Sequence, residues 1–269
     1  MTLKAVIPPT PIEELLTIMA RLRHPIKGSP WEREQTSLSI APNMLEEAYE
    51  AVDAITHGDV NELRGELGDV LLQVVFHAQI AREQGHFGFN EVVETINNKI
   101  KSRLPAFFSG QDVDVTTQLD KWEEIKREER AAKGYTSIFD GIAPNLPALV
   151  RANKLQSRAS QMGFAWNSMD DVYAKIEEET QEVREAEQSG NRTHLEEEIG
   201  DLLNIVARLA NMLNIDAEQA LRHSNIKFEK RLRHVEQRMK DGSHPHKETP
   251  LETLMEFWRE AKAKEKASK

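Results

Sequence analysis

The sequence predicts an all-α protein that consists of two tandem helical bundle domains. Three observations lead to this fold class. Apolar residues recur at helical spacing along most of the 269 residues, and few segments show the period-two alternation of strands. Charged residues make up 30% of the chain and aromatic residues only 6%. Finally, one ordered set of residues occurs twice, which indicates an internal duplication.

The duplicated set runs through most of the chain. An offset that is constant within helices and changes at loops is expected for a duplicated domain. We therefore predict an N-terminal domain at 1–134, a linker rich in turn residues at 135–147 and a C-terminal domain at 148–269. The offset is 132 for Glu46/Glu178, Glu47/Glu179, Glu50/Glu182, Glu66/Glu198 and Asp69/Asp201, 128 for Asn97/Asn225, Lys99/Lys227 and Arg103/Arg231, and 136 for Trp122/Trp258 and Lys126/Lys262.

The first half is expected to contain five helices. Thr10, Pro11 and Glu13 predict the start of the first, because Thr is a good cap, Pro suits the first turn and Glu can close a capping box. This helix should end near His24, and a polar stretch follows up to position 36. The other helices are expected at about 42–57, from 60 to about 85, from 90 to 105 and from 118 to 134.

In the second half the same order of helices returns. The segment at 195–212 contains helix formers throughout, no proline, and apolar residues on nearly every side, as in a helix that is buried on most faces. The other helices are expected at about 148–162, 170–187 and 216–240, with a last helix that carries Trp258 and Lys262.

Two adjacent helices of the second half carry a pattern of carboxylates. Glu178, Glu179 and Glu182 form E-E-x-x-E on one helix, and Glu198 and Asp201 form E-x-x-D on the next. Antiparallel packing of these helices would bring about four carboxylates together. Such a cluster would raise its own pKa values unless a hard cation such as Mg²⁺ neutralised it. The first half repeats the pattern with Glu46, Glu47, Glu50, Glu66 and Asp69.

Alternatives stay open for each of these sets. Glu46, Glu47 and Glu50 alone are also typical of a solvated helix face. A di-iron site fits less well, because neither E-x-x-D motif has a histidine at that spacing. Lys227 and Arg231, with Asn225 and Lys262, could bind phosphate oxygens or form a surface ladder of charges. Trp258 could stack on a nucleobase or anchor the core.

Composition narrows the cellular setting and the partners. A net charge of −10 argues against a non-specific nucleic-acid surface. No apolar run reaches the length of a membrane helix, and the first eleven residues are too short and too broken by proline for a signal peptide. The absence of cysteine excludes disulfides and thiol catalysis and fits a reducing cytoplasm. We expect a cytoplasmic protein that binds neither membrane nor nucleic acid.

Several motifs together resemble the MazG nucleoside triphosphate pyrophosphohydrolases in their two-domain bacterial form. The motifs are GSPWEREQT at 28–36, LEEAYE at 45–50, RGELGDVLLQVVF at 64–76, GFAW at 163–166 and KFEKRLRHVE at 227–236. The resemblance implies Mg²⁺-dependent hydrolysis of ribo- and deoxyribonucleoside triphosphates to monophosphate and pyrophosphate by attack of water at the α-phosphorus. It also implies homodimers, Mn²⁺ as a substitute ion, and a role in nucleotide-pool cleansing or regulation.

Mapped onto this chain, the resemblance implies a role for each residue of the pattern. Glu179, Glu182, Glu198 and Asp201 would hold the metal, while Glu178 would support them or orient the water. Lys227, Arg231 and Lys262 would grip the triphosphate beside Asn225, and Trp258 would contact the base or sugar. A second metal site would consist of Glu47, Glu50, Glu66 and Asp69 in a chiefly structural N-terminal domain.

The first half departs from the family pattern at two places, and other functions remain open. Ser29 and Glu32 stand where the family often has Cys and Asp, and Ala106 and Phe107 follow Pro105 where it often has His and Val. The alternatives are an enzyme for one deoxynucleotide or a damaged nucleotide, a purely structural bundle, and a helical regulatory module that binds a nucleotide or a partner without turnover.

Overall fold

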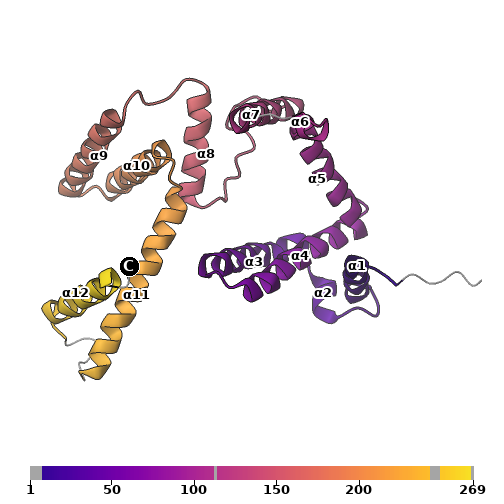
Figure 1. Ribbon diagram of the computed structural model, residues 1–269, viewed down its shortest axis with the longest axis horizontal. Coiled ribbons are helices and arrows are strands. Elements are labelled where there is room, and N and C mark those ends of the chain that lie inside the picture. The colour runs from indigo at the N-terminus through magenta and orange to yellow at the C-terminus, as the bar shows by residue number, and fades with distance from the viewer. Residues whose placement is uncertain (1–7, 112–113, 243–248, 268–269) are drawn as a thin grey trace, which may run out of the picture. The chain divides into compact units, whose positions relative to one another are not determined.

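The computed structural model describes residues 8–111, 114–242 and 249–267, and within them every regular element is a helix (Figure 1). The predicted all-α fold class is therefore confirmed. None of the described helices combines the length and the apolar character that a membrane span needs. The helices are α1 (Pro11–Leu22), α2 (Pro30–Glu34), α3 (Ser37–His57), α4 (Val60–Glu83), α5 (Phe89–Arg103), α6 (Pro105–Phe108), α7 (Val115–Ala132), α8 (Ala148–Gln161), α9 (Met169–Ser189), α10 (Arg192–Met212), α11 (Ala217–Asp241) and α12 (Leu251–Ala267).

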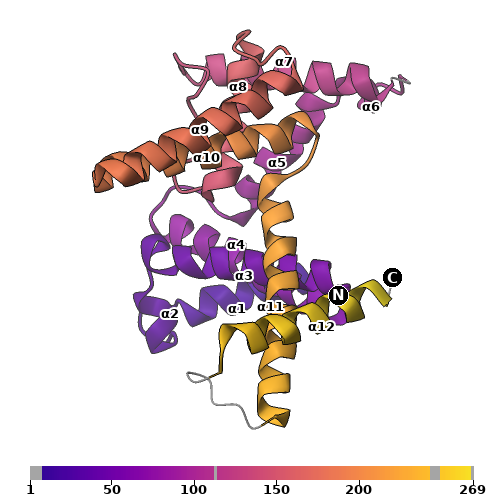
Figure 2. The same ribbon diagram turned by 90° about the vertical axis from the view of Figure 1, so that its left-hand side faces the viewer.

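The chain divides into two compact units, Met1–Glu128 and Glu129–Lys269. In the first unit α3 and α4 form a helical hairpin, and α1 and α5 pack against α4. In the second unit α9 and α10 form the matching hairpin, α8 packs against α10, and α11 pairs with α12 (Figures 1 and 2). The repeated sequence thus gives a repeated pair of long helices, as a duplicated domain should.

Each unit has a buried apolar cluster between some of its helices. In the first unit Met19, Ile40, Val75, Phe76 and Ile80 join α1, α3 and α4. In the second unit a cluster between α11 and α12 contains Val235, Met239 and Phe257. Because the first cluster is centred on α4, it fixes the helix on which Glu66 and Asp69 lie.

The turn inside each long hairpin is built in the same way. Gly58 ends α3 with a left-handed φ of 74°, and Gly190, 132 positions later, ends α9 with a φ of 69°. The next residue caps the following helix, since the Asp59 carboxylate accepts from the Asn61 and Glu62 amides and the Asn191 side chain accepts from the Thr193 and His194 amides. The two hairpins thus share a turn that consists of a left-handed glycine followed by a capping Asp or Asn.

The start of α3 differs from the prediction. The sequence suggested Pro42 as the first residue, but the helix begins at Ser37 and includes Pro42. The reason is a reciprocal cap, in which the Thr36 amide donates to Ser39 Oγ and the Ser39 amide donates to Thr36 Oγ1. The polar stretch before it also contains the short helix α2, which the sequence analysis placed outside helices.

The segment 135–147, expected to be a linker, is attached to the second unit. Arg158 Nη1 on α8 donates to the Ile138 carbonyl at 2.8 Å. Asp140 accepts from the backbone amides of Thr136 and Ser137, which gives the segment a defined local turn. The hydrogen bond between Arg158 and Ile138 therefore ties this segment to α8. The domain limits at 134 and 148 remain predictions.

Candidate functional site

Each long hairpin brings three carboxylates to one place. One carboxylate oxygen from each of Glu179, Glu198 and Asp201 lies within 4.8 Å of the other two. Carboxylate oxygens of Glu47, Glu66 and Asp69 in the first unit are equally close to one another. The E-E-x-x-E helix and the E-x-x-D helix therefore face each other in both units, which is the packing that the sequence pattern suggested.

The remaining glutamates of the pattern lie close to these clusters. In the second unit, loss of hydration and the negative charges of Glu179 and Glu198 raise the pKa of Glu182, against the opposing effect of Lys175. In the first unit, loss of hydration and the charges of its acidic neighbours raise the pKa values of both Glu47 and Glu66. Carboxyls whose pKa values are raised by one another are stabilised by a cation placed between them.

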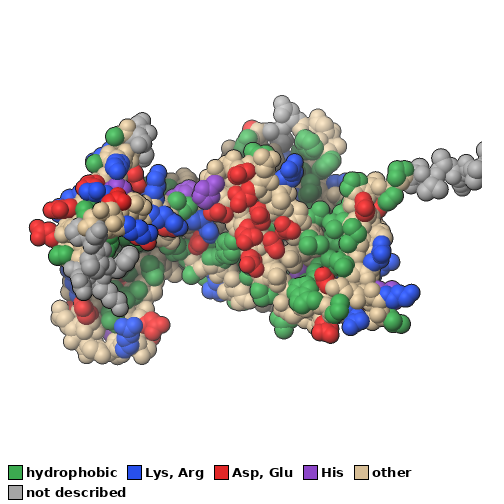
Figure 3. All heavy atoms as spheres, turned by 90° about the horizontal axis from the view of Figure 1, so that it is seen from below, with side chains coloured by type: hydrophobic (Ala, Val, Ile, Leu, Met, Phe, Trp, Pro, Cys, Tyr) green, Lys and Arg blue, Asp and Glu red, His purple; other side chains and the backbone are tan. Residues whose placement is uncertain are grey.

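The two clusters differ in burial and in their neighbours. The burial differs at one position, because Glu179 is only 5% exposed and Glu47 is half-buried; Glu66 and Glu198 are both half-buried, and Asp69 and Asp201 are both exposed. Figure 3 shows acidic side chains gathered in one dense patch in the middle of the face in view. A buried carboxylate needs a partner of opposite charge. The residues around Glu179 therefore determine how its negative charge is neutralised.

Lys175 is that partner, and the sequence analysis missed it. Its Nζ lies 2.7 Å from Glu179 Oε1 and 2.9 Å from Glu178 Oε1. Its hydrogen bonds to Glu179 and Glu178 raise its pKa well above the usual value for lysine. The sequence contained a signal for this pairing, because Lys175 stands three residues before Glu178 and four residues before Glu179, and these spacings bring side chains together on a helix. Asn43 occupies the equivalent position 132 residues earlier, so this lysine is absent from the first unit.

The five predicted nucleotide-binding residues lie together on another hairpin. Asn225, Lys227 and Arg231 are on α11, and Trp258 and Lys262 are on α12. Arg231 lies over the Trp258 ring, 5.4 Å from its centroid. It also pairs with Glu265 at 2.7 Å, and its hydrogen bonds and charge lower the pKa of that carboxyl. Glu265, which the sequence analysis also missed, thus neutralises the charge of Arg231, one of the predicted phosphate-binding residues.

A cavity of about 480 Å³ adjoins the second carboxylate cluster. Lys175 and two carboxylates of the cluster, Glu179 and Asp201, line part of it. The rest of the wall comes from α8, α10 and two loop segments, and it is formed by Phe139, Leu155, Gln156, Ala159, Phe164, Trp166, Asn204, Ile205 and Arg208. The carboxylates therefore border an open cavity large enough for a small organic ligand.

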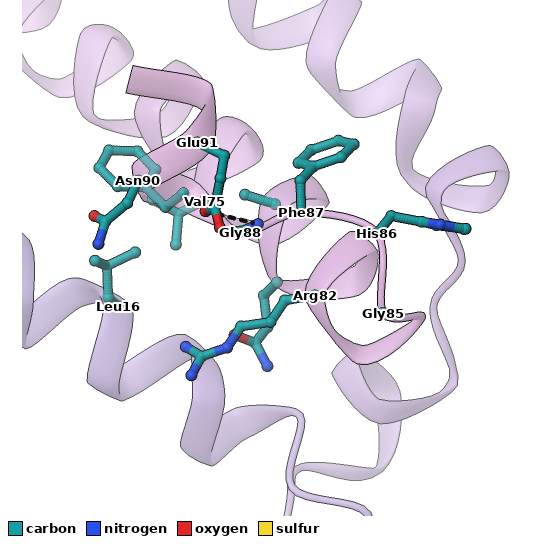
Figure 4. A pocket seen from close by; sticks show the side chains of 12 residues that line it. Leu16, Val75, Arg82, Gly85, His86, Phe87, Gly88, Asn90 and Glu91 are labelled. Atoms are coloured by element: carbon teal, nitrogen blue, oxygen red, sulfur yellow. Dashed lines mark hydrogen bonds between the residues drawn. The ribbon is translucent and has the colours of Figure 1, made fainter. Parts of the chain in front are cut away.

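A further cavity of about 410 Å³ lies in the first unit (Figure 4). Its wall comes from α1, from α4, from the loop between α4 and α5, and from the first residues of α5, and it includes Leu16, Arg82 and Phe87. The Glu91 carboxylate accepts from the Gly88 amide at 3.1 Å, as drawn in Figure 4. None of Glu47, Glu66 and Asp69 is among its lining residues, so this cavity is separate from the first carboxylate cluster.

Comparison with known proteins agrees with the duplicated pattern. The family described as the MazG nucleotide pyrophosphohydrolase domain matches residues 35–108 and 168–236, one segment in each half. These segments contain α3 and α4 in the first unit and α9 and α10 in the second. The family match therefore covers both long hairpins and both carboxylate clusters.

Curated relatives extend over nearly the whole chain. A nucleoside triphosphate pyrophosphohydrolase of Escherichia coli (strain K12) is 46% identical over 94% of this chain and 98% of its own length. A nucleoside triphosphate pyrophosphohydrolase/pyrophosphatase MazG of Thermotoga maritima is 42% identical over 93% of this chain and 95% of its own length. With the match in both halves, these similarities show that the chain belongs to the MazG nucleotide pyrophosphohydrolase family, a family of hydrolases.

Proposed function

We propose that this protein hydrolyses nucleoside triphosphates to a nucleoside monophosphate and pyrophosphate with the help of Mg²⁺. The observation that carries the proposal is the convergence of Glu179, Glu198 and Asp201 beside a ligand-sized cavity. The printed names of the E. coli and T. maritima relatives support the same reaction. A cluster of carboxylate oxygen donors suits a hard divalent cation better than a soft one.

In this proposal Glu179, Glu182, Glu198 and Asp201 hold the metal. A bound Mg²⁺ supplies charge neutralisation for the phosphate oxygens and for the departing pyrophosphate. Lys175 adds a fixed positive charge at the mouth of the cavity, since two carboxylates keep it protonated. Glu178 is exposed, and its Oε1 accepts from Lys175 Nζ at 2.9 Å; it is the carboxylate that we propose orients the attacking water and accepts its proton.

The α11–α12 hairpin provides the proposed phosphate-binding cations. Lys227, Arg231 and Lys262, with Asn225 beside them, would bind the triphosphate oxygens. Glu265 accepts from Nε and Nη2 of Arg231, so phosphate would either bind the remaining N–H groups of the guanidinium or displace Glu265. Trp258 holds the guanidinium in place by stacking beneath it.

A homodimer is part of the same proposal. On α10, Ile199, Leu203 and Val206 lie on one side of the helix and are 44%, 56% and 45% exposed. Leu67 and Leu71, the residues 132 positions before Ile199 and Leu203, are also exposed, at 53% and 39%. Apolar residues left open at equivalent positions of both hairpins support the pairing of each hairpin with a second copy of the chain.

Product analysis tests the reaction and assigns it to a unit. The full chain is incubated with Mg²⁺ and each of the eight common triphosphates, and pyrophosphate is resolved from orthophosphate. Asp201→Ala and Asp69→Ala form a matched pair, because they remove the same carboxylate from the two clusters. We expect pyrophosphate and monophosphate from the wild type and from Asp69→Ala, and loss of both products with Asp201→Ala.

Other outcomes have distinct meanings. Loss with Asp69→Ala alone would place the reaction in the first unit. Orthophosphate with diphosphate would show cleavage of the other anhydride bond. Tight nucleotide binding with no product over hours would favour the regulatory module instead of the enzyme. A preference for one modified triphosphate over all eight common ones would indicate a narrow housecleaning enzyme.

A further inference from the structure

The wall of the cavity beside the second carboxylate cluster combines two chemically different sets of residues. Lys175, Glu179 and Asp201 are the charged set. Phe139, Phe164 and Trp166, which we call the aromatic end of the cavity, are 40%, 79% and 37% exposed. Aromatic rings left open around a cavity offer flat apolar surface to a ligand. The same cavity can therefore hold a ligand with a charged part and an aromatic part.

Two polar side chains of the aromatic end have unsatisfied hydrogen-bonding atoms. Gln156 Nε2 donates to the Asn204 carbonyl at 2.9 Å and to Asn204 Oδ1 at 2.6 Å, while Gln156 Oε1 is buried and has no partner among the described residues. Arg208 is 8% exposed, and its Nη1 donates to Ser160 Oγ at 3.2 Å. Its Nε is buried and also lacks a partner in that part of the chain. Buried polar atoms of this kind gain free energy when a ligand or a water supplies the missing bond.

We propose that this end of the cavity binds the base of the nucleotide, with Phe164 and Trp166 stacking on its ring and Gln156, Asn204 and Arg208 contacting its polar edge. The inference rests on the proposed function, since it extends the site that holds the phosphates. Nucleobases combine a flat π-face with donors and acceptors on the edge, which matches the rings and the unpaired atoms of this cavity. Its volume of about 480 Å³ is within the usual range for small-ligand sites.

The first unit provides an internal comparison. Leu72 and Phe76 stand 132 positions before Asn204 and Arg208, so the polar edge-binding residues of α10 are apolar on α4. Phe76 is 5% exposed and belongs to the core cluster of the first unit. Trp31 packs edge-on against its ring at 6.3 Å. The base-binding end is thus built in the second unit, whereas in the first unit the equivalent positions fill the core.

This assignment separates the base from Trp258. The Trp258 ring already packs against Phe228 at 5.4 Å between centroids and lies under the Arg231 guanidinium. In the proposal Trp258 positions the phosphate-binding arginine, and the rings at 164 and 166 bind the base. Replacing Trp166 and replacing Trp258 should therefore change different kinetic parameters.

In this proposal the side-chain amide of Gln156 would serve different bases by turning over, which would exchange the Nε2 hydrogen bonds to Asn204 for bonds to the base. An amide can present its oxygen to an amino group or its nitrogen to a carbonyl group. Gln156→Glu removes the donor and leaves carboxylate oxygens that only accept. We expect this variant to favour CTP, whose base edge carries an amino group, and to raise the CTP/UTP ratio of kcat/KM on the order of ten-fold.

The test measures kcat and KM for CTP and UTP with the full chain and Mg²⁺. Phe164→Ala and Trp166→Ala should raise KM on the order of ten-fold with little change in kcat. They should also weaken product inhibition by the monophosphate, which retains the base, and leave inhibition by pyrophosphate unchanged. Phe107→Ala is the matched control, since Phe107 is a comparably exposed phenylalanine, at 71%, in the first unit. Thermal unfolding checks that each variant is folded.

The outcomes separate this inference from the proposed function. Wild-type protein that releases no pyrophosphate would overturn both. Wild-type turnover with unchanged KM and unchanged CTP/UTP ratio in the Phe164, Trp166 and Gln156 variants would overturn the base site alone. A loss of base selectivity in Trp258→Ala instead would move the base to α12. Variants that change the oligomeric mass and leave KM unchanged would show that these aromatic residues contact a second copy.

Discussion

At the scale of single residues, each cluster brings several negatively charged carboxylates together, and nearby basic side chains offset only part of that charge. In the second unit Lys175 contacts Glu179 at 2.7 Å, and His194 Nδ1 lies 3.2 Å from Glu198 Oε1. Loss of hydration, and then the charges of Glu179 and Glu198, raise the pKa of Glu182 despite the opposing charge of Lys175. A bound cation would remove the remaining repulsion, so metal binding and stability should be linked.

The first prediction concerns Asp201→Asn. Removing one negative charge relieves repulsion, so we expect the metal-free variant to be more stable than the wild type by roughly 1 kcal/mol. Wild-type protein should gain about 2.7 kcal/mol at a Mg²⁺ concentration one hundred times Kd, and the variant should lose most of this gain. Thermal unfolding with EDTA and with Mg²⁺ measures both effects. Glu196→Gln, an exposed glutamate on the same helix, is the control, and an equal loss of the Mg²⁺ effect there would contradict a specific site.

The second prediction concerns the buried Arg23, which is 8% exposed and pairs with Glu83 at 2.7 Å. Burial tends to raise the pKa of Glu83, but hydrogen bonds from Arg23 and Gln79 and the charge of Arg23 outweigh it, so that the pKa is lowered. A carboxyl with a lowered folded-state pKa stabilises the protein at pH values above its unfolded-state pKa, about 4.3. That stabilisation is lost as the pH falls through the lower folded-state value.

Glu83→Gln should therefore be clearly less stable than wild type at pH 7, and the difference should shrink as the pH falls below about 4. Urea unfolding at a series of pH values measures it. A difference independent of pH would show that Glu83 acts through packing and not through its charge. Arg23→Ala should be destabilised by about 3 kcal/mol, because Glu83 is left without its partner and the carbonyls of Glu32 and Gln35 lose their donor.

At the scale of helices, the unit of construction is a hairpin with a capped turn. Gly58 and Gly190 take left-handed φ values, and Asp59 and Asn191 satisfy the first amides of the next helix. These residues set where the second helix begins and hence which of its faces meets the first. The opposition of the E-E-x-x-E and E-x-x-D motifs depends on this register.

The third prediction compares two glycines of the α9–α10 hairpin. Gly190→Ala should destabilise the second unit by about 1 kcal/mol, because a Cβ is strained at a φ of 69°. Gly200→Ala should instead be neutral or stabilising by up to about 1 kcal/mol, since Gly200 is inside α10 and a Cβ would contact nothing within 4 Å in this chain. Chemical denaturation measures both. Destabilisation by Gly200→Ala would indicate that another chain packs closely at that position.

At the scale of the whole molecule, the two units share the long helical hairpin and differ in the residues around its carboxylates. Both carry a carboxylate cluster, but the second has Lys175 and an adjoining cavity with aromatic walls. In the first unit, core residues Phe76 and Ile80 on α4 pack with Met19 and Ile40. This difference supports the proposal that the second unit is catalytic and that the first is chiefly structural.

The fourth prediction concerns assembly. If a second copy covers the exposed side of α10, then Leu203→Glu should place a charge in the interface and halve the measured mass. Light scattering coupled to size-exclusion chromatography measures the mass. Glu197→Lys on the same helix is the control, since Glu197 is exposed and lies outside the apolar side. A wild-type protein that elutes as a monomer at all concentrations would contradict the homodimer.

Much of this structure could be predicted from local sequence. Helical periodicity predicted the fold class, because burial of an apolar stripe requires that spacing. The constant offset of 132 predicted two equivalent hairpins, and the E-x-x-D spacing placed Glu198 and Asp201 on one helix face. The caps at Thr10, Asp59 and their neighbours were also predictable, since capping depends on residues only two or three positions apart.

By itself, the sequence determined the helices, the duplication and the two sets of carboxylates, because these depend on spacing within one or two adjacent helices. Only the tertiary structure decided that Phe139, Phe164 and Gln156 border the cavity beside Glu179, and that Glu265 neutralises Arg231. These residues are distant in sequence, and their positions are set by how α8 packs on α10 and α12 on α11. Packing between helices depends on the combined shapes of many side chains, so it cannot be predicted from a short sequence motif.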